Sequence, residues 1–257
     1  MSLLAAVIGN SHTVLGLLED GVLVSDWRVA TDERRTADEW AIVLRGLLAD
    51  RVGEVDGIAV CATVPAVLHE WRTMLDDHFG GVPRVVVEPG IRTGIPVLMD
   101  NPREVGADRV VNAVAAAHAF PGAAIVVDFG GTATTFDVVN AKGQYIGGAI
   151  TPGIEISLDA LGRRGAQLRK VELQRPRSVI ARNTVEALQS GMVFGVAAQV
   201  EGMVARMLGE LGEEAAPVRV ISTGYLAPLV VGECACFTDH APSLTLQGLG
   251  LVFDRNS

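Results

Sequence analysis

The chain has 257 residues and a formal net charge of −9, with 49% hydrophobic and 20% charged residues. This composition is typical of a globular protein, and the length allows one large domain or two small ones. The acidic balance, without a basic block, argues against nucleic acid or an anionic membrane as a partner. No apolar run approaches the roughly 20 residues of a membrane span, and the N-terminus lacks the basic start of a signal peptide. We therefore expect a cytoplasmic protein.

Two stretches of the chain share one pattern: an apolar strand, a tight turn with glycine and hydroxyl side chains, and a second apolar strand. They span residues 3–18 and 123–139, and a third strand follows each of them, at 21–29 and 143–150. Glycine lets the backbone turn sharply and approach a ligand closely. Turn N–H groups and hydroxyls that point to one place can hold a phosphate. A single copy would be interpreted as an ordinary core hairpin, but the duplication favours a site for a nucleoside triphosphate.

Helices and strands alternate after the first three strands. Thr36 and Glu39 form a capping pattern at the start of one helix. Buried strands are expected at 57–63 and 84–89, with a helix that begins at Pro65 between them. This order of elements predicts an α/β fold with a mixed sheet and helices on both faces.

The rest of the chain repeats this alternation around the second hairpin. In chain order we expect a loop at 91–104, a helix at 106–120, a helix within 151–168, a connector at 169–182, a long helix at 184–211, a strand at 218–223 and a terminal helix at 244–256. The long helix carries Gly191, Gly195 and Gly202, which are poor helix formers. Glycines at four-residue spacing allow close helix approach, so this helix is predicted to pack against a partner subunit.

The duplicated hairpins and the repeated element order resemble the actin, Hsp70 and sugar-kinase superfamily. More closely, nearly the full length of the chain resembles the type III pantothenate kinases. The segments that carry this resemblance are NPREVGADRVVNA (101–113), IVVDFG (125–130), GGAITPG (147–153), RNTVEALQSG (182–191) and LTLQGL (244–249). The resemblance implies two duplicated actin-like (ribonuclease H-like) halves, at 1–117 and 118–257, each with a mixed five-stranded sheet flanked by helices. It places a dimerisation helix in the second half.

The resemblance also implies a reaction. It is the ATP-dependent phosphorylation of pantothenate to 4'-phosphopantothenate in coenzyme A biosynthesis, catalysed by a homodimer. The implied cofactors are Mg²⁺ with ATP and a monovalent cation, K⁺ or NH4⁺. A primary hydroxyl must lose its proton as it attacks the γ-phosphate, and the rest of the catalysis is positioning and charge neutralisation.

The residues expected to bind the acceptor lie near the middle of the chain. Asp108 resembles the family's general base, although an acid in the first turn of a helix also complements the helix dipole. Arg109 resembles a substrate-contacting arginine, whose planar fork suits a carboxylate; a surface ion pair is the alternative. Thr184 resembles a substrate contact that reaches across the dimer, and it could also be an N-cap. The remaining expected substrate-binding positions are Gly106, Ala107 and Met99, which stands where the family usually has tyrosine.

The nucleotide site is expected at the two hairpins. Asp128 resembles the acid that holds a cation beside the phosphates, and burying an acid unpaired at the end of an apolar strand would be costly. The expected nucleotide-binding positions are Gly9, Asn10, Ser11, Thr13, Gly130, Thr132 and Gly224.

Three departures from the family pattern fall on these nucleotide motifs. Val7 stands where the first hairpin of the family has aspartate, and valine cannot hold a metal. Gly131 makes the second turn one residue longer than in the family. Tyr225 replaces the last glycine of Thr-Gly-Gly, where it is expected to fill part of the purine pocket and to be strained if the position needs a positive φ. Because the three lie on different loops, their effects are expected to be at least partly independent and to weaken ATP binding.

Two hypotheses of different classes follow. In the first, the chain is a type III pantothenate kinase whose activity is weak or altered. In the second, it is a catalytically inactive homologue (a pseudokinase) with a binding or regulatory role. A kinase for a different small hydroxylated acceptor is a variant of the first. The presence of Asp108 and Asp128 favours the kinase.

Overall fold

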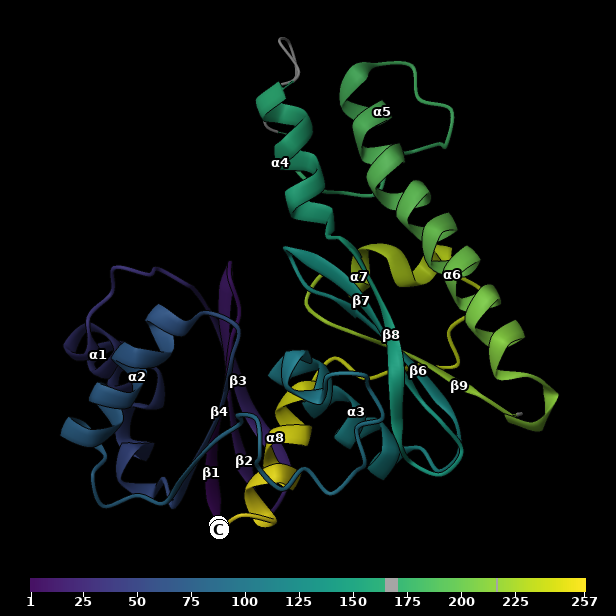
Figure 1. Cartoon of the computed structure of the whole chain (residues 1–257). Helices are drawn as coiled ribbons and strands as arrows, with labels where there is room; N and C mark the ends of the chain where they lie inside the picture. The colour runs from purple at the N-terminus through teal and green to yellow at the C-terminus, as the bar shows by residue number, and fades with distance from the viewer. Residues whose placement is uncertain (165–170, 216) are drawn as a thin grey trace. The chain divides into compact units, whose positions relative to one another are not determined.

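The structure, a computed structural model, describes residues 1–164, 171–215 and 217–257. Contacts divide the chain into two compact units (Figure 1). The first unit comprises Met1–Ala115 together with Ser243–Ser257, and the second comprises Ala116–Pro242. Each unit contains one five-stranded sheet flanked by helices, which confirms the expected fold class.

The sheet of the first unit is mixed. Its strands are β1 (Ser2–Ile8), β2 (His12–Glu19), β3 (Val22–Ala30), β4 (Gly57–Ala62) and β5 (Arg84–Val86). They lie in the order β3-β2-β1-β4-β5. The pairs β1–β2 and β2–β3 are antiparallel, whereas β1–β4 and β4–β5 are parallel.

The sheet of the second unit repeats this arrangement. Its strands are β6 (Ala124–Phe129), β7 (Ala133–Val139), β8 (Tyr145–Pro152), β9 (Arg219–Thr223) and β10 (Asp239–His240). They lie in the order β10-β9-β6-β7-β8, with β6–β7 and β7–β8 antiparallel and β6–β9 and β9–β10 parallel. The duplication seen in the sequence is therefore a duplication of topology.

Helices α1 (Ala37–Leu48) and α2 (Pro65–His78) cover one face of the first sheet (Figure 1). The predicted capping box is present at α1, because Thr36 and Glu39 each accept a hydrogen bond from the backbone N–H of the other. The two helices meet through Trp40 and Trp71, which are fully buried with ring centroids 5.3 Å apart. Short 3₁₀ turns, η1 (Ala49–Glu54) and η2 (Pro102–Glu104), complete this part of the chain.

The C-terminal helix α8 (Leu244–Asp254) packs on the same first sheet, with its apolar side chains against β1 and β4. The structure thus differs from the expected division, which assigned the whole stretch after residue 117 to the second half. The physical reason is the fit at Gly57 and Gly16. An added Cβ at Gly57 would overlap the Phe253 ring, and one at Gly16 would lie 2.8 Å from Leu246. The missing side chains make room for α8 on the sheet.

The contact between Gly57 and Phe253 predicts a destabilising substitution. Gly57→Val should lower the free energy of unfolding by about 1–3 kcal/mol, because a side chain there overpacks the core against Phe253. Gly53→Val is the matched control, since an added Cβ at this exposed glycine meets nothing within 4 Å in the described structure. Urea denaturation of both variants tests the expectation, and equal midpoints would contradict it.

The helices of the second unit are α4 (Ile154–Arg164), α5 (Thr184–Ser190), α6 (Val196–Leu211) and α7 (Ala227–Val230). The π-helical segment Gly191–Gly195 joins α5 to α6, so the long helix predicted at 184–211 is confirmed with a local change of pitch. Short 3₁₀ turns lie at Glu213–Ala215 and Val231–Glu233. The last residues of the helix expected within 151–168, and the start of the connector, fall outside the described residues.

The continuous helix Thr184–Leu211 is long and apolar enough to cross a membrane, by length and composition only. This finding differs from the sequence-based expectation that no apolar run approaches the length of a membrane span. Ala197, Val200 and Val204 of this helix are buried in the core of the second unit. A single helix that passes this test is weak evidence of a membrane span.

Candidate active site

The two hairpins close with turns of equal length. Residues 9–11 connect β1 to β2, and residues 130–132 connect β6 to β7. The strand partners that flank the turns also correspond, with Ile8 opposite Thr13 and Phe129 opposite Thr134. In this chain the additional Gly131 therefore occupies the turn without shifting the register of the strands.

Both turns begin with a glycine that has little room for a side chain. An added Cβ at Gly9 would lie 3.1 Å from the carbonyl oxygen of His12, and one at Gly130 would lie 3.2 Å from that of Ala133. In the first turn the N–H of Gly9 donates to His12 at 3.0 Å. Asn10 and Ser11 at its tip are exposed, so their side chains are accessible to a ligand.

Val7 and Asp128 occupy the same position in the two units. Val7 lies next to Val14 and Cys61 on the neighbouring strands, whereas Asp128 lies next to Thr135 and Thr223. Paired residues on adjacent strands point to the same face of a sheet. The second unit therefore presents an oxygen-rich strip, and the first unit an apolar one that packs on its core.

Asp128 lies against the backbone of the loop that follows β9. Gly224 has a φ of 90°, and an added Cβ there would overlap Asp128 Oδ1 and lie 2.7 Å from the backbone nitrogen of Phe129. Only glycine fits this position, because both its conformation and its surroundings exclude a side chain. Gly224 thus holds the loop directly beside the carboxylate.

The threonines of the site differ in their hydrogen bonds. Thr13 is fully buried, and its Oγ1 lies 2.9 Å from Thr31 Oγ1. In the second unit the hydroxyls of Thr134 and Thr223 are buried without a hydrogen-bond partner among the described residues. Thr132 is partly exposed, and its carbonyl accepts a 2.9 Å hydrogen bond from Gly153 N–H.

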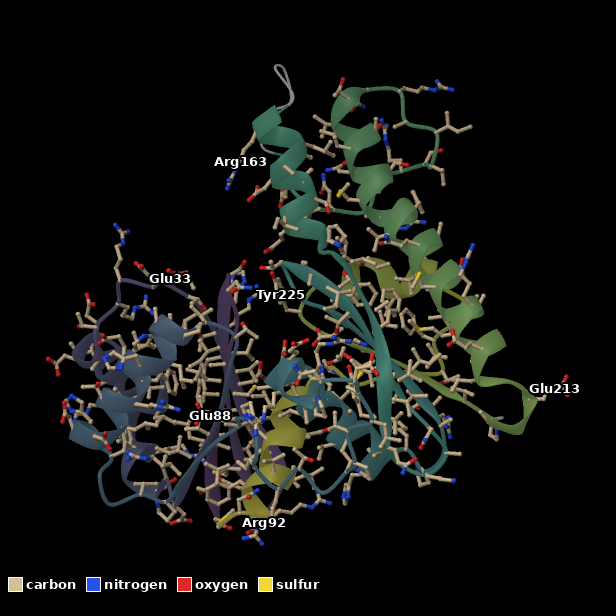
Figure 2. The ribbon with its side chains drawn as sticks, in the orientation of Figure 1. Glu33, Glu88, Arg92, Arg163, Glu213 and Tyr225 are labelled. Atoms are coloured by element: carbon tan, nitrogen blue, oxygen red, sulfur yellow. The ribbon has the colours of Figure 1, made fainter. Side chains whose placement is uncertain are left out.

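Tyr225 lies differently from what the sequence led us to expect (Figure 2). Among the described residues only Asp20 and Ala49 combine a side chain with a positive φ, so Tyr225 is not strained. Its hydroxyl donates a 2.6 Å hydrogen bond to Oε2 of Glu155, in the first turn of α4. An added Cβ at Gly131 would overlap Tyr225 Oη and lie 2.5 Å from Glu155 Oε2. Tyr225 therefore lies over the second turn and contacts the position of Gly131, so two of the three departures are neighbours in space.

Glu155 is a residue that sequence reasoning missed. It lies two residues after the segment GGAITPG, and its only signal in the sequence is an acid near the start of a predicted helix. Such acids commonly complement the helix dipole. Only the folding of the β9–α7 loop towards α4 brings Glu155 to Tyr225.

Asp108 lies in the first turn of α3 (Ala107–Ala119) and is half-buried. Its Oδ1 accepts a 3.0 Å hydrogen bond from the backbone N–H of Arg109, and an added Cβ at Gly106 would lie 2.6 Å from the same oxygen. Burial raises the pKa of Asp108, while the amide hydrogen bond and the Arg109 charge oppose the rise. A carboxyl whose pKa is raised is a stronger base when ionised, which suits proton abstraction.

The C-terminal helix holds the start of α3 in place. Thr245 Oγ1 donates a 2.7 Å hydrogen bond to Oδ1 of the fully buried Asn112. An added Cβ at Gly248 would overlap the Val111 carbonyl oxygen, so the two helices are in backbone contact. The segments LTLQGL and NPREVGADRVVNA are thus in contact in the structure.

The other expected substrate-binding residues are placed as follows. Ala107 and Arg109 are half-buried at the start of α3, and Met99 is half-buried in the irregular stretch before η2. Thr184 is the exposed first residue of α5. The N-cap is Asn183, whose Oδ1 accepts from the N–H of Glu186 at 2.9 Å, so the suggestion that Thr184 is an N-cap was wrong.

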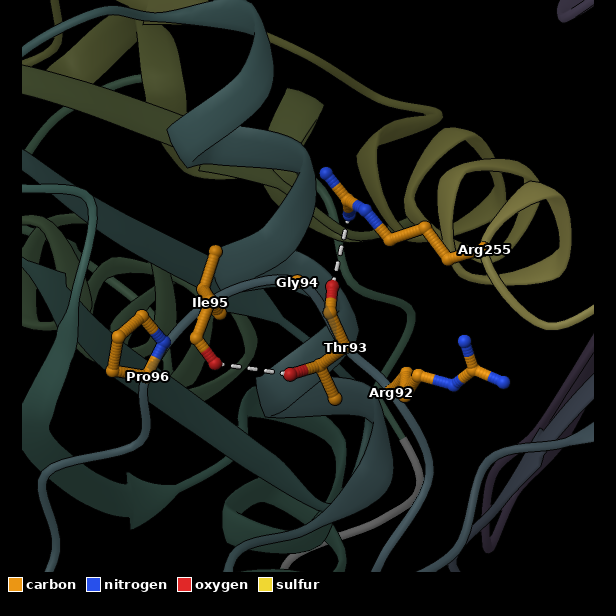
Figure 3. Close-up of a pocket in the computed structure, with 6 residues that line it drawn as sticks. All are labelled: Arg92, Thr93, Gly94, Ile95, Pro96 and Arg255. Atoms are coloured by element: carbon orange, nitrogen blue, oxygen red, sulfur yellow. Dashed lines mark hydrogen bonds between the residues drawn. The ribbon is translucent and has the colours of Figure 1, made fainter.

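A separate cavity of about 610 Å³ opens on the first unit (Figure 3). Its lining residues are Arg92, Thr93, Gly94, Ile95, Pro96 and Arg255. Arg255 Nη1 donates to the carbonyl of Thr93 at 2.9 Å, and an added Cβ at Gly94 would meet the Arg255 guanidinium. None of the expected site residues lines this cavity.

No cluster of three or more His, Cys, Asp or Glu side chains suited to a metal occurs in the part of the chain that the structure describes. The residues near Asp128 nevertheless fit a hard cation that brings phosphate and water ligands with it. Asp128 supplies carboxylate oxygens, and the adjacent Thr223 has a buried hydroxyl without a hydrogen-bond partner in the described residues. Mg²⁺ and K⁺ both prefer oxygen ligands of this kind, and Mg²⁺ usually keeps several waters.

The duplicated sheets define an actin-like fold of the kind found in sugar kinases. A hexokinase of the ROK type from Thermus thermophilus matches with a TM-score of 0.53 and 14% identity, over 98% of each chain. The activator of 2-hydroxyisocaproyl-CoA dehydratase from Clostridium difficile, solved with bound ADPNP, matches with a TM-score of 0.59 and 12% identity, over 99% of this chain and 95% of that one. These likenesses concern the fold alone.

Sequence comparison is more specific. The model of the type III pantothenate kinase family matches residues 3–206. A type III pantothenate kinase from Nocardioides sp. is 74% identical over the full length of both chains. Another, from Streptomyces coelicolor, is 58% identical over 99% of this chain and 98% of the relative. The chain belongs to the type III pantothenate kinase family, and this result does not favour the non-catalytic alternative.

The raised pKa of Asp108 predicts how stability depends on pH. When the folded pKa of an acid exceeds its unfolded value, its stabilisation is fully present below the unfolded pKa and is lost as pH rises through the folded pKa. Asparagine does not titrate, so the Asp108→Asn variant does not lose stability in this way. The free energy of unfolding of the variant, relative to that of the parent, should therefore increase as pH rises from about 4, the ordinary Asp value, to 7. Urea denaturation across this range measures the difference. Asp77→Asn, at an exposed position, is the control. If the stability difference between variant and parent does not change with pH for either variant, the assignment is contradicted.

Proposed function

We propose that this chain transfers the γ-phosphate of ATP to the primary hydroxyl of pantothenate, forming 4'-phosphopantothenate. The observation that carries the proposal is Asp108, half-buried at the start of α3 in a chain that belongs to the type III pantothenate kinase family along its length. This carboxylate takes the proton of the attacking hydroxyl, as a general base does. The reaction belongs to coenzyme A biosynthesis, and we place the protein in the cytoplasm.

The acceptor is held by groups near the base. The guanidinium of Arg109, adjacent to Asp108, can bind the carboxylate of pantothenate in a bidentate way. Gly106 leaves room beside Asp108 Oδ1, where any side chain would interfere. Ala107 and Met99 complete the proposed acceptor site on this unit, and Thr184 acts on the acceptor site of a second copy.

The donor is held by the glycine turns and the residues beside them. Each unit contributes its own turn: the exposed Asn10 and Ser11 in the first, and Gly130 and Thr132 in the second, present N–H and hydroxyl groups that can bind phosphates. Divalent metal with ATP neutralises phosphate charge when bound, and Asp128 with Thr223 is the proposed place for a cation. A monovalent cation, K⁺ or NH4⁺, is proposed at the same oxygen-rich strip.

The general base is tested by substitution. Asp108→Asn should lower kcat by on the order of 10²–10⁴-fold, because it removes proton abstraction, while the KM for pantothenate changes less. In the parent protein, kcat/KM should fall as pH decreases through the Asp108 pKa, which lies above its ordinary value. A coupled assay with ATP, pantothenate, Mg²⁺ and K⁺ measures both quantities. Asp77→Asn serves as the control, and unchanged turnover in Asp108→Asn would remove this residue from the mechanism.

We further propose that the chain is a homodimer with the helix Thr184–Leu211 at the interface. Only a minor part of this apolar helix is buried within its unit. An added Cβ at Gly191 or Gly195 meets nothing within 4 Å in the described structure, so packing within the chain does not account for these glycines. Close approach of a second helix does, since it needs small side chains. Nearby apolar side chains are also exposed, namely Ile156, Leu161, Val179, Ile180 and Val185.

The interface proposal predicts an oligomeric change. Light scattering at micromolar concentration should give a dimer for the parent protein and a monomer for Gly195→Leu, because leucine prevents close helix approach. Gly46→Leu is the matched control, since Gly46 is an exposed helical glycine with no neighbour within 4 Å in the described structure. A parent monomer, or a dimer that tolerates Gly195→Leu, would contradict the proposal.

A further inference from the structure

Tyr225, Glu155 and Gly131 form one compact arrangement on the β6–β7 turn. The Tyr225 hydroxyl donates to Glu155 Oε2 at 2.6 Å, and the bonded pair lies against Gly131. Gly131 is buried, whereas Tyr225 and Glu155 are half-buried. We call this arrangement, Tyr225 with Glu155 over Gly131, the turn cap.

The turn cap explains why residue 131 is glycine. An added Cβ there would overlap Tyr225 Oη and lie 2.5 Å from Glu155 Oε2. Residue 131 does not have a positive φ, so the requirement for glycine is steric rather than conformational. The extra turn residue and the tyrosine are therefore mutually compatible parts of one feature, since any larger residue in the turn would displace the cap.

The start of α4 also hydrogen-bonds to the backbone of the turn. Gly153 N–H donates to the carbonyl of Thr132 at 2.9 Å, and Ile156 N–H donates to that of Gly131 at 3.4 Å. An added Cβ at Gly153 would lie 2.5 Å from the Gly131 carbonyl oxygen. The turn is thus closely packed against the start of α4. Glu155 is part of this helix, so its backbone is fixed relative to the turn.

A carboxylate in this position opposes phosphate binding. Glu155 Oε2 lies beside the backbone of a glycine turn whose N–H groups would otherwise meet a phosphate. Two negative charges at close range repel, and more strongly where water is partly excluded. The hydrogen bond from Tyr225 keeps the carboxylate there.

We propose that Tyr225 is a positioning residue that acts through Glu155 to limit how tightly a polyphosphate binds at the β6–β7 turn. The inference rests on the proposed function, in which this turn binds ATP. It differs from a block of the purine pocket, because the hydroxyl of Tyr225 is directed to the turn and to Glu155. Tyr225 acts on the phosphates rather than on the base.

Three substitutions separate the parts of the turn cap. Tyr225→Phe removes the hydroxyl and keeps the ring, Glu155→Gln removes the charge, and Asp159→Asn removes an equal charge from an exposed position on the same helix. Calorimetry with MgATP should show affinity increased on the order of tenfold by each of the first two, the scale of one charged hydrogen bond, and unchanged by the control. The affinity for inorganic tripolyphosphate should increase in the same two variants, whereas the affinity for adenosine should not change.

The coupling within the turn cap is tested by combining changes. Tyr225→Phe with Glu155→Gln should gain clearly less than the product of the two single effects, because either change alone releases the same contact. Gly131→Ala should lower the Tm of the parent protein and should lower it less in a Tyr225→Gly background. These thermal measurements depend on packing and not on catalysis.

The outcomes distinguish this inference from the proposed function. Tighter MgATP binding in Tyr225→Phe and Glu155→Gln supports the inference, even if no variant phosphorylates pantothenate, in which case the proposed function alone fails. Unchanged or weaker MgATP and tripolyphosphate binding in both variants overturns the inference, even if the parent protein is an active kinase. Equal gains for adenosine and ATP would also overturn it, because they would place the effect at the base.

Discussion

The register of the first hairpin in each unit is the constraint on which the candidate site depends. Three-residue turns that begin with glycine join β1 to β2 and β6 to β7, and the strand partners on each side correspond. This register places Val7 and Asp128 at equivalent positions, beside apolar neighbours in one unit and beside threonines in the other. A shift of one residue would turn every side chain to the opposite face. The backbone geometry is therefore the same at Val7 and at Asp128, and only the side chains make the strip apolar in the first unit and polar in the second.

The residues proposed to bind the acceptor depend on a second constraint, the packing of α8 on the first sheet and on α3. Glycines allow backbone contact at both places, at Gly57 against Phe253 and at Gly248 against Val111. Because α8 comes from the end of the chain, the start of α3 is held by a segment distant in sequence. Asp108 is buried enough for its pKa to rise, and this property follows from packing rather than from its immediate sequence neighbours.

The nucleotide motifs are altered in a way that the structure makes coherent. Gly131 lengthens the second turn to match the first, and Tyr225 lies over it with a hydrogen bond to Glu155. Substitutions that looked like separate losses in the sequence are in contact in space. Only the apolar change at Val7 lies in the other unit. The altered turn is compatible with membership of a kinase family, because the family is shown by the match over residues 3–206 and by a relative 74% identical over the full length.

The sequence by itself determined the element order, the duplicated topology, the capping of α1 and the family, because these follow from local patterns of apolar residues, glycines and caps. It could not assign α8 to the first unit, since that depends on the fit of its side chains into spaces above Gly16 and Gly57. Nor could it indicate Glu155, because an acid in a first helical turn has the same local signal whether it faces solvent or a tyrosine hydroxyl. Only the tertiary structure decided that Tyr225 contacts Gly131 and Glu155. The contact joins a loop, a turn and the start of a helix that are far apart in the sequence.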